Sequence, residues 1–139
     1  MSHTTPQTQT HTVLFVDDDV EALDTWVQRF QSYSPNYRVL KTHTVESAID
    51  LCCCQKMDCV VLDLDMGDAS GFDVLLTLVP DRNCREIAVV VLTHLVNPTI
   101  HALTVENGAH ACLVKQRTSP QQLDHAIQTA IASRQRHAH

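Results

Sequence analysis

The chain has little positive charge and no long hydrophobic run. Its 139 residues include 10 Lys and Arg against 16 Asp and Glu, which gives a formal net charge of −6. Nucleic-acid phosphates are bound by basic patches, so this balance argues against direct nucleic-acid binding. No apolar stretch approaches the roughly 18 residues that cross a bilayer, and the start MSHTTPQTQTHT lacks the pattern of a secretory signal. We therefore expect a cytoplasmic protein without a membrane partner.

Cysteine pairs with the CxxC spacing are also missing. The chain has six cysteines, and none of them forms a CxxC pair. Zinc sites usually show regularly spaced ligand pairs, so the sequence indicates neither a zinc site nor a disulfide framework. Cys59 and Cys112 stand inside apolar runs and are predicted to be small core side chains.

The length of the chain is that of one domain. Residues 1–11 are polar and predict a disordered N-terminal tail. The domain itself is predicted over residues 12–134, and residues 135–139 are predicted to be a C-terminal tail.

Short apolar segments alternate with helix-like segments through this domain. Strands are predicted at 13–16, 37–42, 59–62, 87–92 and 111–114, and helices at 17–32, 45–56, 71–79, 97–109 and 123–134. Uninterrupted apolar strands between helices predict a parallel sheet covered on both faces. Only 37–42 alternates polar and apolar residues, as an edge strand would. The predicted fold class is therefore α/β, a doubly wound (βα)5 unit with strand order 2-1-3-4-5.

Four of the predicted strands end in a charged or hydroxyl residue. Asp17 and Asp18 follow the first strand, Asp63 the third, Thr93 the fourth and Lys115 the fifth. Because the carboxyl ends of parallel strands meet at one edge of the sheet, these side chains should converge. The sequence predicts an acidic pocket with a hydroxyl group on one side and an ammonium group on the other.

Three carboxylates in one cleft repel each other unless a cation neutralises them. Oxygen ligands without nearby His or Cys favour a hard ion such as Mg²⁺. A carboxylate beside Mg²⁺, with an amine and a hydroxyl aimed at the same point, suits a phosphoryl group. Asp63 is then predicted to be a nucleophile that forms an acyl phosphate.

Over about residues 12 to 134 the chain resembles the receiver domain of two-component response regulators. VDDD matches the acidic pair of that family, LDLDM its phosphoacceptor, VLTH its switch threonine and LVK its lysine. The resemblance implies a flavodoxin-like fold. It also implies that Asp63 takes its phosphoryl group from a sensor histidine kinase or a phosphotransfer protein.

The same resemblance implies roles for the other site residues. Asp18 would bind Mg²⁺ directly and Asp17 partly through water, while the backbone carbonyl of Asp65 would complete the protein ligands. Thr93 would turn toward the phosphoryl group, and Lys115 would pair with it.

The output implied by the resemblance is a change of packing. Phosphorylation would bias the face that runs from the fourth strand to the fifth helix, where a downstream effector protein or domain binds. A homodimer through that face is left open. Catalysis would be limited to the domain's own phosphoryl transfer and autodephosphorylation.

Four positions depart from the family pattern. Gly67 and Gln116 stand where the family usually has prolines, the second of them cis, and Cys112 replaces an aromatic residue. A cis bond before a non-proline residue costs roughly 2.5–4 kcal/mol, so the bond before Gln116 is expected to be trans, in a rearranged or strained loop. His94 replaces a small residue and is either a gate over the acyl phosphate or a solvated rim residue.

Two other functions compete with this interpretation. LDLDMG also resembles the DxD motif of haloacid-dehalogenase-type phosphatases, but those enzymes need an acidic pair after the lysine, and only Asp124 follows Lys115 here. A receiver-like docking module that is not phosphorylated is the second alternative, and the residues at 112 and 116 favour it. Retention of all the site residues argues against it.

Overall fold

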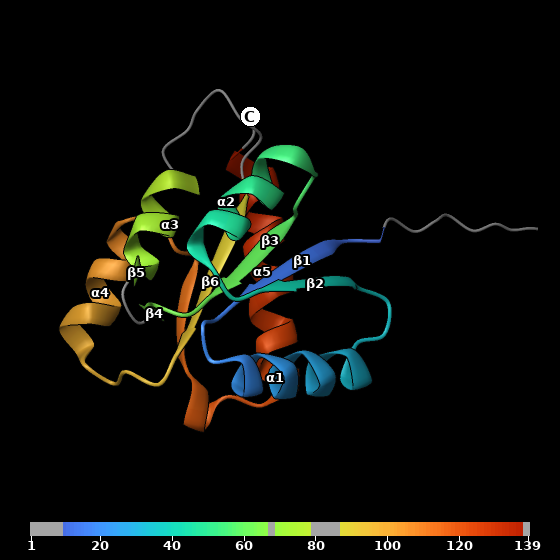
Figure 1. Ribbon diagram of the computed structural model, residues 1–139, viewed down its shortest axis with the longest axis horizontal. Coiled ribbons are helices and arrows are strands. Elements are labelled where there is room, and N and C mark those ends of the chain that lie inside the picture. Colours follow the sequence, from blue (N-terminus) through green and yellow to red (C-terminus); the bar gives the residue numbers. More distant parts are fainter. Residues whose placement is uncertain (1–9, 67–68, 79–86, 138–139) are drawn as a thin grey trace, which may run out of the picture.

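The computed structural model describes residues 10–66, 69–78 and 87–137 (Figure 1). Its main sheet has five strands in the order β2-β1-β3-β6-β7, and every neighbouring pair is parallel. The strands are β1 (Thr12–Val16), β2 (Arg38–Thr42), β3 (Cys59–Leu62), β6 (Ala88–Thr93) and β7 (Ala111–Val114). The predicted order 2-1-3-4-5 is confirmed, and the strand with alternating residues, β2, lies at an edge.

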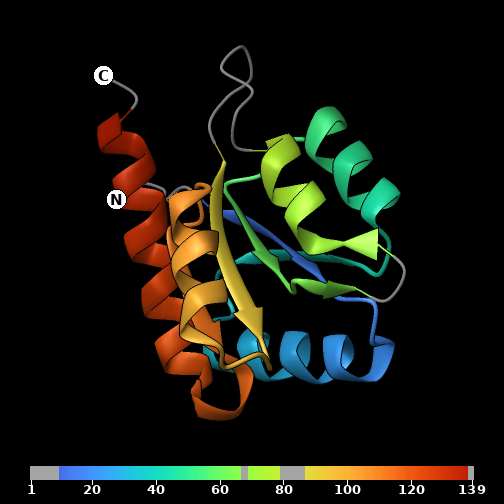
Figure 2. The same ribbon diagram turned by 90° about the vertical axis from the view of Figure 1, so that its left-hand side faces the viewer.

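The helices cover both faces of this sheet. They are α1 (Val20–Tyr33), α2 (Val45–Cys54), α3 (Gly71–Leu78), α4 (Pro98–Glu106) and α5 (Pro120–His137). Core residues of α1 and α5 pack on one face, and those of α2, α3 and α4 pack on the other. Figure 2 shows α2 and α3 across the sheet from α1 and α5. Within the described ranges no helix is long and apolar enough to cross a membrane.

Apolar positions three or four residues apart along α1 and α5 are buried. Leu23, Val27 and Phe30 of α1 share one cluster with Leu123 and Ile127 of α5. Burying each such side chain contributes about 1.5–3 kcal/mol, so this layer holds both helices firmly against β1 and β3.

The two cysteines predicted to be core residues differ in burial. Cys59 on the central strand β3 is fully buried, whereas Cys112 on β7 is only half-buried. The prediction for Cys112 was wrong in degree, because β7 is an edge strand with a neighbour on one side only.

Side-chain caps fix where the helices begin. Asp19 accepts a hydrogen bond from the Ala22 amide and caps α1. Ser119 and Gln122 bond each other's backbone amides at the start of α5. Both helices therefore begin directly beside the strand ends that carry Asp17 and Lys115.

Two turns near the carboxyl edge of the sheet differ from simple loops. A short hairpin of two strands with two residues each, β4 (Asp65–Met66) and β5 (Ala69–Ser70), follows β3 and was not predicted. Gly67, one of the departures from the family pattern, lies outside the described residues. After β7 the chain enters a short 3₁₀ turn, η1 (Lys115–Arg117). No described peptide bond is cis, so the bond before Gln116 is trans as predicted.

A buried ion pair joins the far end of α5 to the opposite edge of the sheet. An Arg134 guanidinium nitrogen lies 3.0 Å from the Asp58 carbonyl oxygen and 3.4 Å from its Oδ1. The other carboxylate oxygen of Asp58 accepts a hydrogen bond from the Thr12 amide at 2.8 Å. One carboxylate thus ties the start of β1 and the end of α5 to β3. Helix α5 continues to His137, beyond the predicted domain end at residue 134.

Candidate functional site

Asp17 and Asp63 lie side by side at the carboxyl edge of the sheet. Asp17 follows β1 and donates its backbone N–H to the Thr42 carbonyl at 3.3 Å, while Asp63 follows β3 and donates to the Val16 carbonyl at 3.0 Å. These bonds continue the strand pairing by one residue, so both carboxylates leave the sheet at the same level. They are 5% and 4% exposed, which makes them buried carboxylates at a sheet edge.

The Lys115 ammonium group bridges these two carboxylates. Its Nζ lies 2.6 Å from Asp17 Oδ2 and 3.2 Å from Asp63 Oδ2. The pairing of β6 with β7 sets Val114 opposite Thr93, so the residue after Val114 emerges next to the same edge. The three groups carry two negative charges against one positive charge, and their site has an unbalanced negative charge.

The remaining carboxylate oxygens are held by backbone amides. Asp17 Oδ1 accepts from the Asp19 N–H at 3.0 Å, and Asp63 Oδ1 accepts from the Asp65 N–H at 3.1 Å. Each bond reaches two residues ahead and fixes the side chain before any ligand arrives. The site is therefore preorganised by the loops that leave β1 and β3.

Burial and the neighbouring charges shift the ionisation of Asp63 and Lys115. Burial raises the pKa of Asp63, and the nearby Lys115 charge and the Asp65 amide offset only part of that rise. Burial works against the Lys115 ammonium, but hydrogen bonding and attraction from Asp17 and Asp63 outweigh it and raise the pKa of Lys115. The ammonium stays charged at neutral pH, whereas ionising Asp63 costs folding free energy.

We expect Asp63→Asn to stabilise the fold at neutral pH by roughly 0.5–2 kcal/mol, because it leaves one carboxylate facing one ammonium. The folded-state pKa of Asp63 is raised, so in the wild type its stability is full in acid and falls as pH rises through that pKa. The advantage of the variant should therefore be smallest near pH 4 and grow toward pH 7. Urea unfolding across this range measures it, and a pH-independent difference would contradict the assignment.

Thr93 and His94 border the site from the end of β6. Thr93 is buried, and its Oγ1 accepts a hydrogen bond from the Leu95 amide at 3.3 Å. His94 Nε2 lies 3.5 Å from Asp65 Oδ2, and both side chains are about half exposed. Sequence reasoning considered the two positions separately, and no spacing signal could have shown that they meet. The gate function of His94 stays a prediction.

Asp18 is exposed, unlike the residue before it. In the part of the chain that the structure describes, no three His, Cys, Asp or Glu side chains are arranged to hold a metal ion together. Asp17 and Asp63 nevertheless turn one oxygen each toward the same cation, the Lys115 ammonium. Magnesium commonly takes one or two protein carboxylates and completes its shell with water and phosphate oxygens. The donor chemistry fits Mg²⁺, and the metal roles of Asp17, Asp18, Asp63 and the Asp65 carbonyl stay predictions.

Trp26 of α1 is a neighbour of the site that the motifs at the strand ends did not reveal. A cavity of about 10 Å³ behind Asp17, Asp63 and Lys115 is lined by Trp26 and Leu23 of α1, among others. The helical spacing of apolar residues in α1 predicts that Trp26 is buried, but it does not show that the ring lies next to the carboxylates. As the chain's single tryptophan, it is a built-in fluorescent reporter of this site.

Comparison with known proteins identifies the family. The family model "Response regulator receiver domain" matches residues 13–128, so the chain belongs to that family. A curated relative from Vibrio cholerae, named "Probable cyclic di-GMP phosphodiesterase", is 29% identical over 98 residues, which are 70% of this chain and 22% of that protein. The chain therefore spans about a fifth of that relative's length.

Solved structures share the fold. A CheY-like receiver domain from Methanospirillum hungatei superposes with a TM-score of 0.78 at 19% identity, covering 93% of this chain and 99% of that chain. The chemotaxis response regulator CheY4 of Vibrio cholerae gives a TM-score of 0.75 at 20% identity, covering 88% and 99%. At this identity the likeness establishes the flavodoxin-like receiver fold.

Proposed function

We propose that the chain is the phosphoacceptor domain of a two-component or phosphorelay system, and that Asp63 is the residue phosphorylated. One observation carries the proposal. The carboxylates of Asp63 and Asp17 are buried together at the edge of the sheet, with the Lys115 ammonium bonded to both. A structural core has no need for this arrangement, since buried charges of like sign cost free energy.

The proposed reaction is a phosphoryl transfer from a phosphohistidine of a sensor kinase or phosphotransfer protein. A carboxylate oxygen of Asp63 attacks phosphorus, the new O–P bond forms as the N–P bond breaks, and the imidazole leaves. Lys115, already 3.2 Å from Asp63 Oδ2, is placed to pair with the phosphoryl oxygens. The Thr93 hydroxyl is the neutral donor at the end of the adjacent strand β6.

Mg²⁺ would supply the neutralising charge when bound. Asp17, Asp18, Asp63 and the carbonyl of Asp65 are the groups proposed to hold it. The protein's own part is to keep Asp17 and Asp63 oriented through the amides of Asp19 and Asp65.

Catalysis by the domain is proposed to be limited to its own phosphoryl transfer and autodephosphorylation. The phosphatase alternative needs acidic residues after the lysine at the same site. Asp124 instead accepts hydrogen bonds from Ser34 and Tyr37, between α1 and α5. The docking-module alternative draws on Cys112 and Gln116, and the phosphorylation experiment below separates it from the proposed function.

The proposed output is a change of packing in the face formed by α4, β7 and α5. A phosphoryl group adds about −1.5 to −2 charges beside Thr93 and Lys115, which begin the connections to α4 and α5. Leu103 and Val105 of α4 are about half exposed, so an effector protein or a second copy has apolar surface to contact there. A coupling free energy of roughly 1–3 kcal/mol between phosphorylation and partner binding would be ordinary for such a switch. The protein is proposed to act in the cytoplasm.

Intact-mass analysis with Mg²⁺ and acetyl phosphate tests the proposal. We expect the wild type to gain one phosphoryl group and Asp63→Asn to gain none. Asp50→Asn, an exposed carboxylate of α2, is the matched control and should be phosphorylated normally. Trp26 fluorescence in the same buffer reports Mg²⁺ binding, so wild-type protein that binds Mg²⁺ but gains no mass would favour the docking module.

His94→Ala is expected to shorten the lifetime of the acyl phosphate several-fold. The imidazole and the Asp65 carboxylate meet at 3.5 Å beside the phosphoacceptor, where together they obstruct attack by water. The decay of the phosphorylated mass after removal of the donor measures the lifetime. His43→Ala, an exposed histidine on the β2–α2 connection, is the control, and equal decay in all three proteins would assign His94 to the solvated rim.

A further inference from the structure

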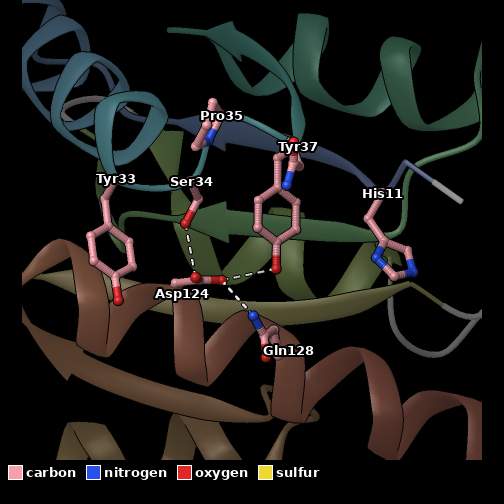
Figure 3. A pocket seen from close by; sticks show the side chains of 8 residues that line it. His11, Tyr33, Ser34, Pro35, Tyr37, Asp124 and Gln128 are labelled. Carbon is pink, nitrogen blue, oxygen red and sulfur yellow. Dashed lines mark hydrogen bonds between the residues drawn. The ribbon is translucent and has the colours of Figure 1, made fainter. Parts of the chain in front are cut away.

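A cavity lies away from the phosphoacceptor site, at the corner between the end of α1, the start of β2 and α5. It has a volume of about 530 Å³ and is lined by residues that include Tyr33, Ser34, Tyr37, Asp124 and Gln128 (Figure 3). Pockets for small molecules usually measure roughly 300–1,000 Å³. The cavity is large enough for a ligand, and nothing in the proposed phosphoryl transfer uses it.

The Asp124 carboxylate is the charged group at the centre of this cavity. Its Oδ1 accepts from the Tyr37 hydroxyl at 2.9 Å and from Gln128 Nε2 at 3.1 Å, and its Oδ2 accepts from Ser34 Oγ at 2.8 Å. A carboxylate has about four acceptor positions, so Oδ2 keeps one. All three donors are neutral, and none of the ion pairs found among the described residues includes Asp124. Within the described part of the chain, this half-buried negative charge therefore has hydrogen-bond donors but no cationic partner.

Aromatic rings stand on both sides of this carboxylate. Figure 3 shows Tyr33 on one side of Asp124 and Tyr37 on the other. Tyr37 is fixed by its bond to Asp124 and by Phe30, whose ring centroid lies 5.2 Å away. Burial, followed by the Asp124 carboxylate, raises the pKa of Tyr37, which keeps this phenol a neutral donor. Tyr33 is 49% exposed and forms the open wall.

We propose that this cavity binds a small organic cation, with an alkylguanidinium the preferred class. A cation above an aromatic face within about 6 Å is attracted by the ring, and a planar guanidinium both stacks on a ring and donates to a carboxylate. Tyr33 supplies the exposed ring face, Tyr37 forms the opposite wall, and Asp124 Oδ2 supplies the free acceptor. Anions are disfavoured, because the lining carries a carboxylate and no Lys or Arg.

The ligand would join α1 to α5, the two helices that begin beside Asp17 and Lys115. The site does not depend on phosphorylation of Asp63, so the inference stands or falls separately from the proposed function.

Titration of the full chain with n-butylguanidinium, followed by ¹H–¹⁵N NMR, tests the inference. We expect saturable shifts of the Tyr33, Tyr37, Asp124 and Gln128 amides. Equal concentrations of n-butanol and of butyrate should leave these amides in place. Saturable shifts with n-butanol of similar strength would overturn the assignment of a cation site, as would an absence of saturation with n-butylguanidinium.

Variants separate the charge from the aromatic wall. Asp124→Asn keeps an acceptor oxygen for its neighbours but removes the charge, and it should weaken binding about tenfold or more. Tyr33→Ala should weaken binding roughly two- to fivefold, whereas Tyr33→Phe retains the ring and the affinity. Asp50→Asn, on α2, is the matched charge control and should bind as the wild type does.

The two Tyr33 variants keep the inference testable if the Asp124 variant does not fold. Tyr33 is half exposed, so its replacement leaves the core intact even if Asp124→Asn fails to fold. Unchanged affinity in Tyr33→Ala, or in a folded Asp124→Asn, would overturn the inference.

Discussion

Replacing Lys115 with Met is expected to abolish phosphorylation and to destabilise the protein at neutral pH. The ammonium is the positive charge in contact with both Asp17 and Asp63, and its side chain is 15% exposed. Removing one partner from a buried ion pair typically costs 3–5 kcal/mol, and here two carboxylates would face each other without it. The incoming phosphoryl group would also lose its nearest cation on the protein.

The loss of stability should depend on pH. Without the ammonium, the folded-state pKa of Asp63 rises further, because nothing offsets its burial and the neighbouring Asp17 charge. A raised pKa gives stability that is present in acid and lost as the pH rises through it, so Lys115→Met should approach the wild type near pH 4 and fall behind toward pH 7. Urea unfolding at several pH values measures this. Lys56→Met, an exposed lysine beyond α2, is the matched control.

A double-mutant cycle with Asp63→Asn shows whether the loss of stability in Lys115→Met comes from the missing charge. In an Asp63→Asn background only Asp17 is left without its partner, so Lys115→Met should cost clearly less than it does in the wild type. An equal cost in both backgrounds would show that Lys115 acts through packing of its stem, not through its charge.

The second large effect is expected at the opposite end of α5. Arg134→Met should lower the free energy of unfolding by about 3–5 kcal/mol, because it leaves the Asp58 carboxylate buried without its cation. The two residues are 9% and 6% exposed, and the guanidinium also satisfies the Asp58 carbonyl. Chemical denaturation at neutral pH measures the loss.

Removing both charges is the informative control for this pair. Arg134→Met combined with Asp58→Asn should recover much of the stability, since the amide oxygen can still accept from the Thr12 N–H. Arg38→Met, an exposed arginine on β2, should change stability little. A double variant no better than Arg134→Met alone would mean that the bond to the Asp58 carbonyl, not the carboxylate charge, makes the contribution.

The fold was predictable because its signals are local. Apolar runs identified the strands of the sheet, the alternation in 37–42 marked the edge strand, and strand order followed from the rules for parallel sheets. The β4–β5 hairpin was missed because two-residue strands carry no periodicity. The degree of exposure of Cys112 was missed because an apolar run does not show which side of a strand lacks a neighbour.

The sequence predicted which residues lie at the strand ends around the site, but it did not predict the contacts between their side chains. Convergence of Asp17, Asp63 and Lys115 follows from topology alone, and the structure bears it out. That one ammonium lies between both carboxylates, or that His94 reaches Asp65, depends on side-chain conformations that no sequence spacing specifies. The partnership of Asp58 with Arg134 joins residues 76 positions apart and has no sequence signature.

The ion pair between Asp58 and Arg134 limits where the C-terminus of the domain can be truncated. The family match ends at residue 128, whereas the guanidinium that neutralises Asp58 belongs to residue 134. A fragment truncated after residue 128 would keep every group around Asp63 but would lose the ion pair between Arg134 and Asp58 at the other end of the sheet. Fusions and truncations that retain the last two turns of α5 should therefore express as folded protein where shorter versions do not.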